Sequence, residues 1–127
     1  MIPYGKQFID NEDIDSVINV LKSNYLTQGP LTPKFESLIL KKTKSKYAVA
    51  TNSGTSALHI SCLALGLKKN DLLWTSPNSF VASANCAEYC GARVDFVDID
   101  FKTGNVDSDY FEEKIESITF FNIENEI

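Results

Sequence analysis

Arginine and long apolar runs are scarce in this sequence. Arg93 is the only arginine, and the formal net charge is −5. Because nucleic-acid phosphates are bound by clustered Lys and Arg, this balance argues against a nucleic-acid partner. No run approaches the roughly 18 consecutive apolar residues of a membrane span, and the first residues lack the apolar core of an export signal. We therefore expect a cytoplasmic protein that binds neither nucleic acid nor membrane.

Histidine and cysteine are also few. His59 is the only histidine, and Cys62, Cys86 and Cys90 make an odd number of thiols. Without an export signal, such thiols are typical of a reducing compartment. Cys86 and Cys90 stand four residues apart on one helix face, but two ligands make a poor zinc site. We expect no metal, buried cysteines that act as small apolar residues, and a histidine on the surface or with its hydrogen bonds satisfied.

Regular alternation of helix and strand patterns predicts an α/β fold in one domain, residues 1–127. Such alternation is typical of a mostly parallel sheet with crossover helices. Ligands bind these sheets at the carboxyl ends of the strands, which directs attention to the turns after Thr51 and Thr75. The expected strands are 47–51, 72–75 and 94–98. The first two helices are expected to start at Asp10 or Asn11, and at Pro33 after a Thr32 cap. The later helices are expected from about Ser56 to Leu65, ended by Gly66, from Phe80 to Tyr89, and after a cap at Asp107 or Ser108.

The turn after Thr51 carries a glycine and hydroxyl residues in the run Asn52–Leu58. Backbone N–H groups at a helix start lack helical partners, and the helix dipole adds positive potential, so this turn can hold a phosphate. Gly54 lets the backbone approach the anion, and Thr55 can add a hydroxyl. Neither G-x-G-x-x-G nor G-K-[ST] is present. An ordinary N-cap is the alternative interpretation.

The turn after Thr75 leads into Phe80. An aromatic ring beside a phosphate-binding turn can lie on the face of a planar heteroaromatic ligand. A core or helix-staple role is the alternative. Further along, Asp95, Asp98 and Asp100 lack the spacing of a calcium loop, so we interpret them as turn and cap residues.

Three segments in order, Asn52–Leu58, Thr75–Asn85 and Val97–Asp107, resemble the DegT/DnrJ/EryC1/StrS family of pyridoxal-phosphate (PLP) dependent sugar aminotransferases. Ile2–Asp10 and Leu26–Pro30 are similar to the start of that family. The resemblance covers residues 2 to about 115. Within the family, the run looks most like the enzymes that aminate C4 of a UDP-4-keto-6-deoxy-N-acetylhexosamine in the pseudaminic-acid pathway.

The resemblance implies part of a fold-type-I large domain, preceded by amino-terminal helices, with PLP as cofactor. It implies that Gly54 and Thr55 hold the PLP phosphate through backbone N–H groups and that Phe80 stacks on the pyridine ring. Thr27 and Gln28 match a loop that contacts the sugar nucleotide, although a plain turn is the alternative. The implied partners are a nucleotide sugar, an amino donor such as glutamate, and a second copy of the chain in a dimer.

The family's Schiff-base lysine, and the aspartate that pairs with the pyridinium nitrogen, lie further along the chain than residue 127. PLP chemistry needs both, so the resemblance implies no catalytic residue among residues 1–127 and no activity from them alone. Lys102 and Lys114 do not stand in the family's lysine context. Two alternatives stay open: a non-catalytic remnant that binds the PLP phosphate, and part of a PLP-dependent sugar dehydratase in which the lysine is replaced.

Overall fold

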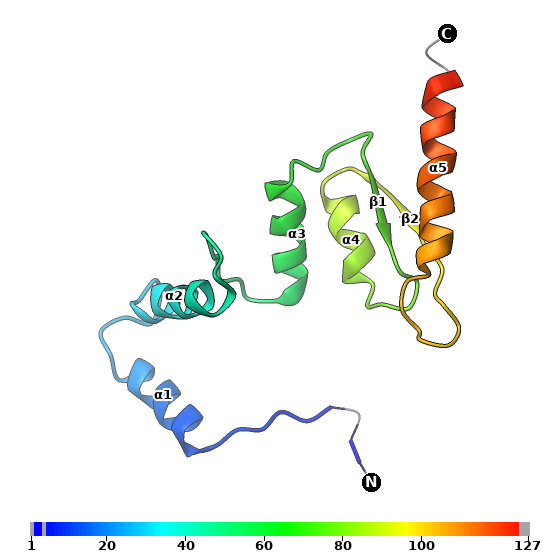
Figure 1. The fold of residues 1–127 in the computed structure, drawn as a ribbon. Helices are drawn as coiled ribbons and strands as arrows, with labels where there is room; N and C mark the ends of the chain where they lie inside the picture. Colours follow the sequence, from blue (N-terminus) through cyan, green and yellow to red (C-terminus); the bar gives the residue numbers. More distant parts are fainter. Residues whose placement is uncertain (1, 4, 125–127) are drawn as a thin grey trace. The chain divides into compact units, whose positions relative to one another are not determined.

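The computed structural model describes residues 2–3 and 5–124, which form two compact units divided between Ala50 and Thr51 (Figure 1). Unit 1 contains two helices, and unit 2 contains a two-stranded sheet with three helices. Unit 1 holds α1 (Asn11–Leu21) and α2 (Leu31–Thr43), and unit 2 holds α3 (Gly54–Ala64), β1 (Leu72–Thr75), α4 (Ala82–Tyr89), β2 (Arg93–Phe96) and α5 (Ser108–Glu124).

Helix α1 begins with a capping box. The Asp10 carboxylate accepts hydrogen bonds from the N–H groups of Glu12 and Asp13, and the Asp13 carboxylate accepts one from the Asp10 N–H. Four helical N–H groups lack helical partners at any start, and this reciprocal arrangement satisfies several of them. The predicted start of the first helix is confirmed.

Helix α2 starts earlier than predicted. The structure places its N-cap at Pro30, without a side-chain cap, instead of at Thr32. The backbone of Pro30 is already helical, with φ −71° and ψ −10°. Thr32 therefore lies within the first turn of the helix, and its hydroxyl is not at the N-cap position. Neither α1 nor α2 buries a side chain completely, so the apolar stripes of unit 1 stay largely open.

The strand predicted over residues 47–51 is wrong, because this segment forms no ladder in the structure. Tyr47 and Val49 are exposed, and the Ala50 N–H donates to the Glu36 carboxylate at 2.8 Å instead of to another strand. A strand needs a neighbouring strand for its backbone hydrogen bonds. Within the described residues, β1 and β2 pair with each other and neither pairs with this segment.

The other two predicted strands form a parallel pair, with Leu72 beside Arg93 and Thr75 beside Phe96. The prediction for β1 is confirmed at both ends, and β2 starts and ends slightly earlier than predicted. Parallel strands need a crossover connection, which α4 provides. Figure 1 shows α3 alongside α4, with α4 and α5 on opposite sides of the strands. The mostly parallel α/β class is therefore confirmed.

The small core of unit 2 lies around α4. Its buried side chains are small: Cys62, Ala82, Cys86, Ala87, Ala92 and Val97. Small side chains let α3, α4 and the sheet approach closely. Burial of Cys62 and Cys86 is confirmed, while Cys90 is half-buried. Burial, reinforced by the neighbouring Cys86 thiol, raises the pKa of Cys62 to about 11, so this thiol stays protonated at neutral pH.

Helix α5 starts at Ser108 because the Asp107 carboxylate accepts hydrogen bonds from the N–H groups of Asp109 and Tyr110. This confirms one of the two caps expected from the sequence. The expected apolar position Ile118 lies beyond the last side chain that the structure describes. Among the described helices, none combines the length and apolar character that a membrane crossing requires.

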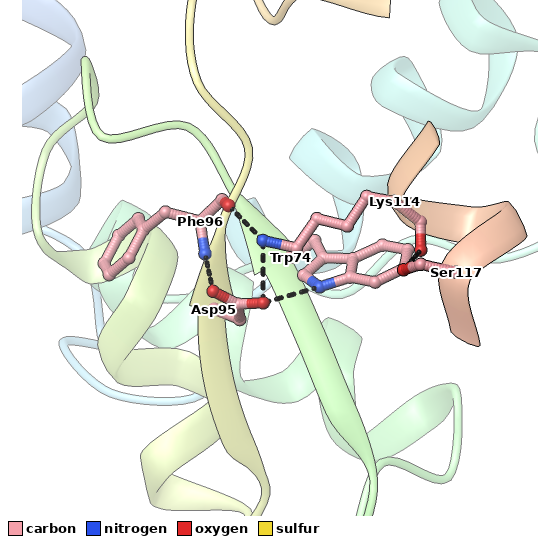
Figure 2. A network of polar contacts seen from close by, with 5 residues as sticks. All are labelled: Trp74, Asp95, Phe96, Lys114 and Ser117. Carbon is pink, nitrogen blue, oxygen red and sulfur yellow. Dashed lines mark hydrogen bonds and ion pairs between the residues drawn. The ribbon is translucent and has the colours of Figure 1, made fainter. Parts of the chain in front are cut away.

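Polar contacts join α5 to the sheet, as Figure 2 shows. Lys114 forms an ion pair with Asp95 at 2.8 Å and donates to the Phe96 carbonyl at 2.6 Å. The Trp74 indole N–H donates to the same Asp95 carboxylate at 3.2 Å, and Phe111 packs edge-on against the Trp74 ring. Trp74 and Asp95 are register partners, so both side chains face α5.

The same contacts satisfy the outward-facing backbone groups of Phe96 at the outer edge of β2. Arg93 and Val97 direct their N–H groups to β1, so by alternation the N–H and C=O of Phe96 point away from β1. The Asp95 carboxylate accepts the Phe96 N–H at 2.8 Å, and Lys114 takes the carbonyl. Natural sheets protect their edges in this way against pairing with another chain.

Asp95 therefore does not act as the turn or cap residue expected from the sequence, because it lies within β2 and its carboxylate serves the sheet and α5. The interpretation of the other two aspartates is confirmed. Asp98 accepts from the Ile99 N–H, and Asp100 accepts from the N–H groups of Lys102 and Thr103.

Replacing Lys114 by methionine should lower the free energy of unfolding at pH 7 by about 1 kcal/mol, because a half-exposed ion pair and a hydrogen bond are lost. Hydrogen bonding from Lys114 lowers the pKa of Asp95. The stabilisation is therefore complete above the unfolded pKa of about 3.9 and is lost as the pH falls through the lower folded pKa. The difference from wild type, measured by urea unfolding, should shrink between pH 7 and pH 3.

Lys102→Met is the matched control, because no side-chain contact is described for Lys102, and it should change stability by less than about 0.5 kcal/mol. An equal loss from both variants, or a Lys114→Met difference that does not vary with pH, would contradict this role of the ion pair.

Candidate functional site

The start of α3 is organised by side chains of its own turn. Ser53 is the N-cap, and its hydroxyl accepts from the Ser56 N–H at 3.1 Å. The Ser56 hydroxyl also lies 2.9 Å from the Ser53 hydroxyl and donates to Asn52 at 3.0 Å. The helix begins two residues before the expected Ser56, so Gly54 and Thr55 lie in its first turn. The cap interpretation is confirmed, and anion binding at this turn stays a prediction.

Two N–H groups at this helix start have no described partner. Ser56 and Ala57 donate to Ser53, whereas no hydrogen bond is described for the N–H of Gly54 or Thr55 or for the Thr55 hydroxyl. Unpaired donors at the positive end of a helix dipole suit a phosphate. An ideal Cβ built on Gly54 meets no atom within 4 Å. The residues present therefore fit a phosphate group, with both donors and space for it.

Phe80 lies at the same end of unit 2 as these donors. Figure 1 shows that α3 and α4 both start at the end where β1 and β2 finish, and Phe80 precedes the first residue of α4 by two positions. The Phe80 side chain is 75% exposed, so the alternative of a core residue is wrong. An exposed aromatic ring at the carboxyl end of a parallel sheet is available to a ligand.

The loop that carries Phe80 is held at two points. The Phe80 carbonyl accepts from the Ser83 N–H at 3.0 Å, which joins the loop to the first turn of α4. The Asn78 amide donates to the Gly104 carbonyl at 3.3 Å, which joins it to the hairpin after β2. Sequence reasoning did not single out Asn78, because its partner stands 26 residues away.

Unit 1 contains a pocket of about 390 Å³ between α1 and the loop that leads into α2. Its lining includes Gln28, one of the two residues expected to contact substrate, but not Thr27. Asn19 of α1 lines the same pocket, and no hydrogen bond is described for the side chain of Asn19 or Gln28. Gln28 adopts φ 50°, a left-handed conformation that residues other than glycine rarely take. No lining residue carries a charge.

His59 and the cysteines do not join these groups. His59 is half-buried, and its ring packs edge-on against the Tyr89 ring at 5.3 Å between centroids. Across the described residues, no group of three or more His, Cys, Asp or Glu side chains is placed to hold a metal ion.

Comparison with known proteins identifies the family. The DegT/DnrJ/EryC1/StrS aminotransferase family matches residues 7–123. The chain belongs to this family. The resemblance seen in the motifs is thereby confirmed, and it extends through most of α5.

Individual relatives share the same segment. A UDP-4-amino-4,6-dideoxy-N-acetyl-beta-L-altrosamine transaminase of Campylobacter jejuni is 41% identical over 115 residues, which are 91% of this chain and 30% of that protein. A solved putative sugar aminotransferase of Streptococcus pneumoniae, in its PLP-form, superposes with a TM-score of 0.81 at 28% identity and covers 88% of this chain and 29% of its own.

A third relative differs in its reaction. The GDP-4-keto-6-deoxy-D-mannose-3-dehydratase of E. coli, solved with bound hydrated PLP, superposes with a TM-score of 0.75 at 32% identity over 83% of this chain and 28% of its own. PLP is thus the cofactor of the family, as expected, and the partial fold-type-I domain is confirmed. The chain spans about 30% of the length of the curated relatives it matches.

Gly54→Ala should leave the fold intact and raise the free energy of unfolding by about 0.4–1 kcal/mol, because Gly54 is helical, its φ is not left-handed, and a Cβ meets no atom. Urea unfolding of the two proteins measures this. Gly104→Ala is the contrasting variant. Gly104 adopts φ 70°, so this substitution should lower the free energy of unfolding. A loss of stability in Gly54→Ala would show that Gly54 has a structural role which the geometry does not reveal.

Proposed function

We propose that this chain is the amino-terminal part of a PLP-dependent aminotransferase that moves an amino group from an amino acid, glutamate by expectation, onto a nucleotide-linked 4-keto-6-deoxy sugar. The observation that carries the proposal is the start of α3, where two unpaired N–H groups lie at the same end of unit 2 as the exposed Phe80. Membership of the aminotransferase family and the Campylobacter relative support the substrate class.

In this proposal the residues of unit 2 bind and orient the cofactor. The N–H groups of Gly54 and Thr55 donate to the phosphate, and the Thr55 hydroxyl adds a third donor. Phe80 covers one face of the ring and excludes water from it. PLP, when bound, supplies an electron sink for amino-group transfer. The residue that moves the proton is the family's lysine, which is not among residues 1–127, so these residues alone would be inactive.

The pocket of unit 1 suits a neutral part of the substrate. Its lining has no charge to bind a diphosphate or the carboxylates of an amino donor. Two free carboxamides, from Asn19 and Gln28, can both donate and accept hydrogen bonds, and such groups suit sugar hydroxyls or a nucleobase edge. The volume, about 390 Å³, is in the range of small-molecule sites. We infer that Gln28, with Asn19, contacts the nucleotide sugar; Thr27 stays a prediction.

A PLP-dependent sugar dehydratase is the second candidate function, favoured by the similarity to the solved E. coli enzyme. Both reactions would use the same phosphate-binding turn and the same ring contact. They differ at the position of the family's lysine, so the described residues serve either. The dimer, the pseudaminic-acid pathway and the cytoplasmic location likewise stay predictions.

The cofactor site predicts two separable losses. Thr55→Val should weaken binding of both inorganic phosphate and 4′-deoxypyridoxine 5′-phosphate about 3–10-fold, because a hydroxyl donor to the anion is lost. Phe80→Ala should weaken only the ring-bearing ligand, by a similar factor. Amide chemical shifts of Gly54 and Thr55 measure both affinities during titration.

Phe101→Ala is the control for Phe80, because Phe101 is an equally large ring that is 98% exposed. It should change neither affinity by more than about 2-fold. If wild type binds neither ligand, or if both ligands shift amides elsewhere in the chain, the proposed cofactor site is wrong.

Asn19→Ala and Gln28→Ala should each weaken binding of UDP-N-acetylglucosamine about 3–10-fold, because each removes a hydrogen-bonding amide from the pocket. Titration calorimetry, or amide shifts of residues in unit 1, measures the affinity. Uridine and N-acetylglucosamine, titrated separately, show which neutral part enters. Asn24→Ala is the matched control, because Asn24 does not line the pocket. Equal effects of all three substitutions would argue against this site.

A further inference from the structure

The hairpin after β2 is held by several internal hydrogen bonds at the carboxyl end of the sheet. Ile99 and Val106 form an antiparallel bridge, and the Asp107 N–H donates to the Asp98 carbonyl. Asp100 closes the turn, because its carboxylate accepts the N–H groups of Lys102 and Thr103 at 3.1 and 2.8 Å. Hydrogen bonding from Thr103 lowers the pKa of Asp100, as expected for a carboxylate that accepts N–H groups in a closed turn.

Gly104 occupies the position of this hairpin that faces the loop after β1. Its φ of 70° is left-handed, which favours glycine there. An added Cβ would lie 3.7 Å from the Asn78 amide nitrogen. The Gly104 carbonyl accepts from this amide, and among the described residues no other side-chain hydrogen bond joins residues 76–81 to the hairpin. The hairpin thus holds the loop through one side chain.

The loop itself has few other restraints before Phe80. The Asn78 N–H donates to the Ser76 hydroxyl at 3.2 Å, a contact local to the turn, and no hydrogen bond is described for Ser79. After Phe80 the chain is fixed by α4. Without the Asn78 tether, the residues before Phe80 would be free to move, and the exposed ring would sample more orientations.

We propose that Asn78 is a positioning residue that orients Phe80 for stacking on the cofactor ring by holding its loop against the Gly104 carbonyl. This inference rests on the proposed function, since it assigns a role toward the same cofactor. Asn78 does not contact the phosphate donors in this proposal. It acts on the ring through Phe80 and leaves the phosphate contacts unchanged.

Titration of the 127-residue chain with 4′-deoxypyridoxine 5′-phosphate and with inorganic phosphate, followed by amide shifts, tests this. Asn78→Ala should weaken the ring-bearing ligand about 3–10-fold and change phosphate binding by less than about 2-fold. Asn78→Asp, which has the same shape but whose ionised carboxylate cannot donate to Gly104, should show the same selective loss. Ser79→Ala, the neighbouring control, should change neither affinity.

The possible results separate a positioning role of Asn78 from a purely structural role. The inference is overturned if Asn78→Ala behaves like Ser79→Ala, or if Asn78→Ala and Asn78→Asp weaken both ligands equally, as a purely structural role would. Wild type that binds neither ligand refutes the proposed function itself, whereas wild type that binds both with unaffected Asn78 variants refutes only the positioning role. The hydrogen bond is exposed, and thermal unfolding of each variant checks that the fold is kept.

Discussion

The parallel pairing of β1 with β2 is the constraint on which unit 2 depends. Parallel strands finish at the same end of the sheet, so the loops that follow them must meet there. The crossover helix α4 returns the chain to the opposite end, and its own start, like that of α3, lies where the strands finish. Helix dipoles and the strand-end loops therefore converge on one region. The unpaired N–H groups of Gly54 and Thr55 and the exposed Phe80 therefore lie at the same end of unit 2 through topology, without proximity in sequence.

A second feature of the structure is that its two units differ in how far their apolar surfaces are covered. On β2, the Phe96 N–H donates to Asp95 and the Phe96 carbonyl accepts from Lys114, and α5 covers the face beside them. Unit 1, in contrast, leaves the apolar stripes of α1 and α2 open. Burial of apolar surface is the main stabilising term in folding, and within the described residues the buried side chains gather in the small core around α4.

At the start of α3, some polar groups bond within the turn and others have no described partner. Ser53 and Ser56 satisfy each other and the backbone, which fixes the turn, and the N–H groups of Gly54 and Thr55 are left over. The same principle applies to the hairpin after β2, where Asp100 holds the turn and the Gly104 carbonyl is left for Asn78. Residues that stabilise a turn internally thus release backbone groups for contacts outside it.

Local sequence determined the elements whose signals are local. The cap at Asp10, the four residues of β1 and the cap at Asp107 were predictable, because caps, apolar runs and turn residues act over a few positions. The motif around Gly54, Thr55 and Phe80 was also visible in the sequence, together with the family that it indicates. These features depend on neighbours along the chain.

Only the tertiary structure decided the features that depend on distant partners. Residues 47–51 have the composition of a buried strand, yet they form no ladder without a neighbouring strand. Asp95 is of a residue type common in turns, but its carboxylate pairs with Lys114 and accepts from Trp74, and so joins β2 to α5. Asn78 gained its role only when the fold brought Gly104 beside it. Ladder hydrogen bonds, ion pairs and loop tethers all join residues far apart in the chain, so no local pattern encodes them.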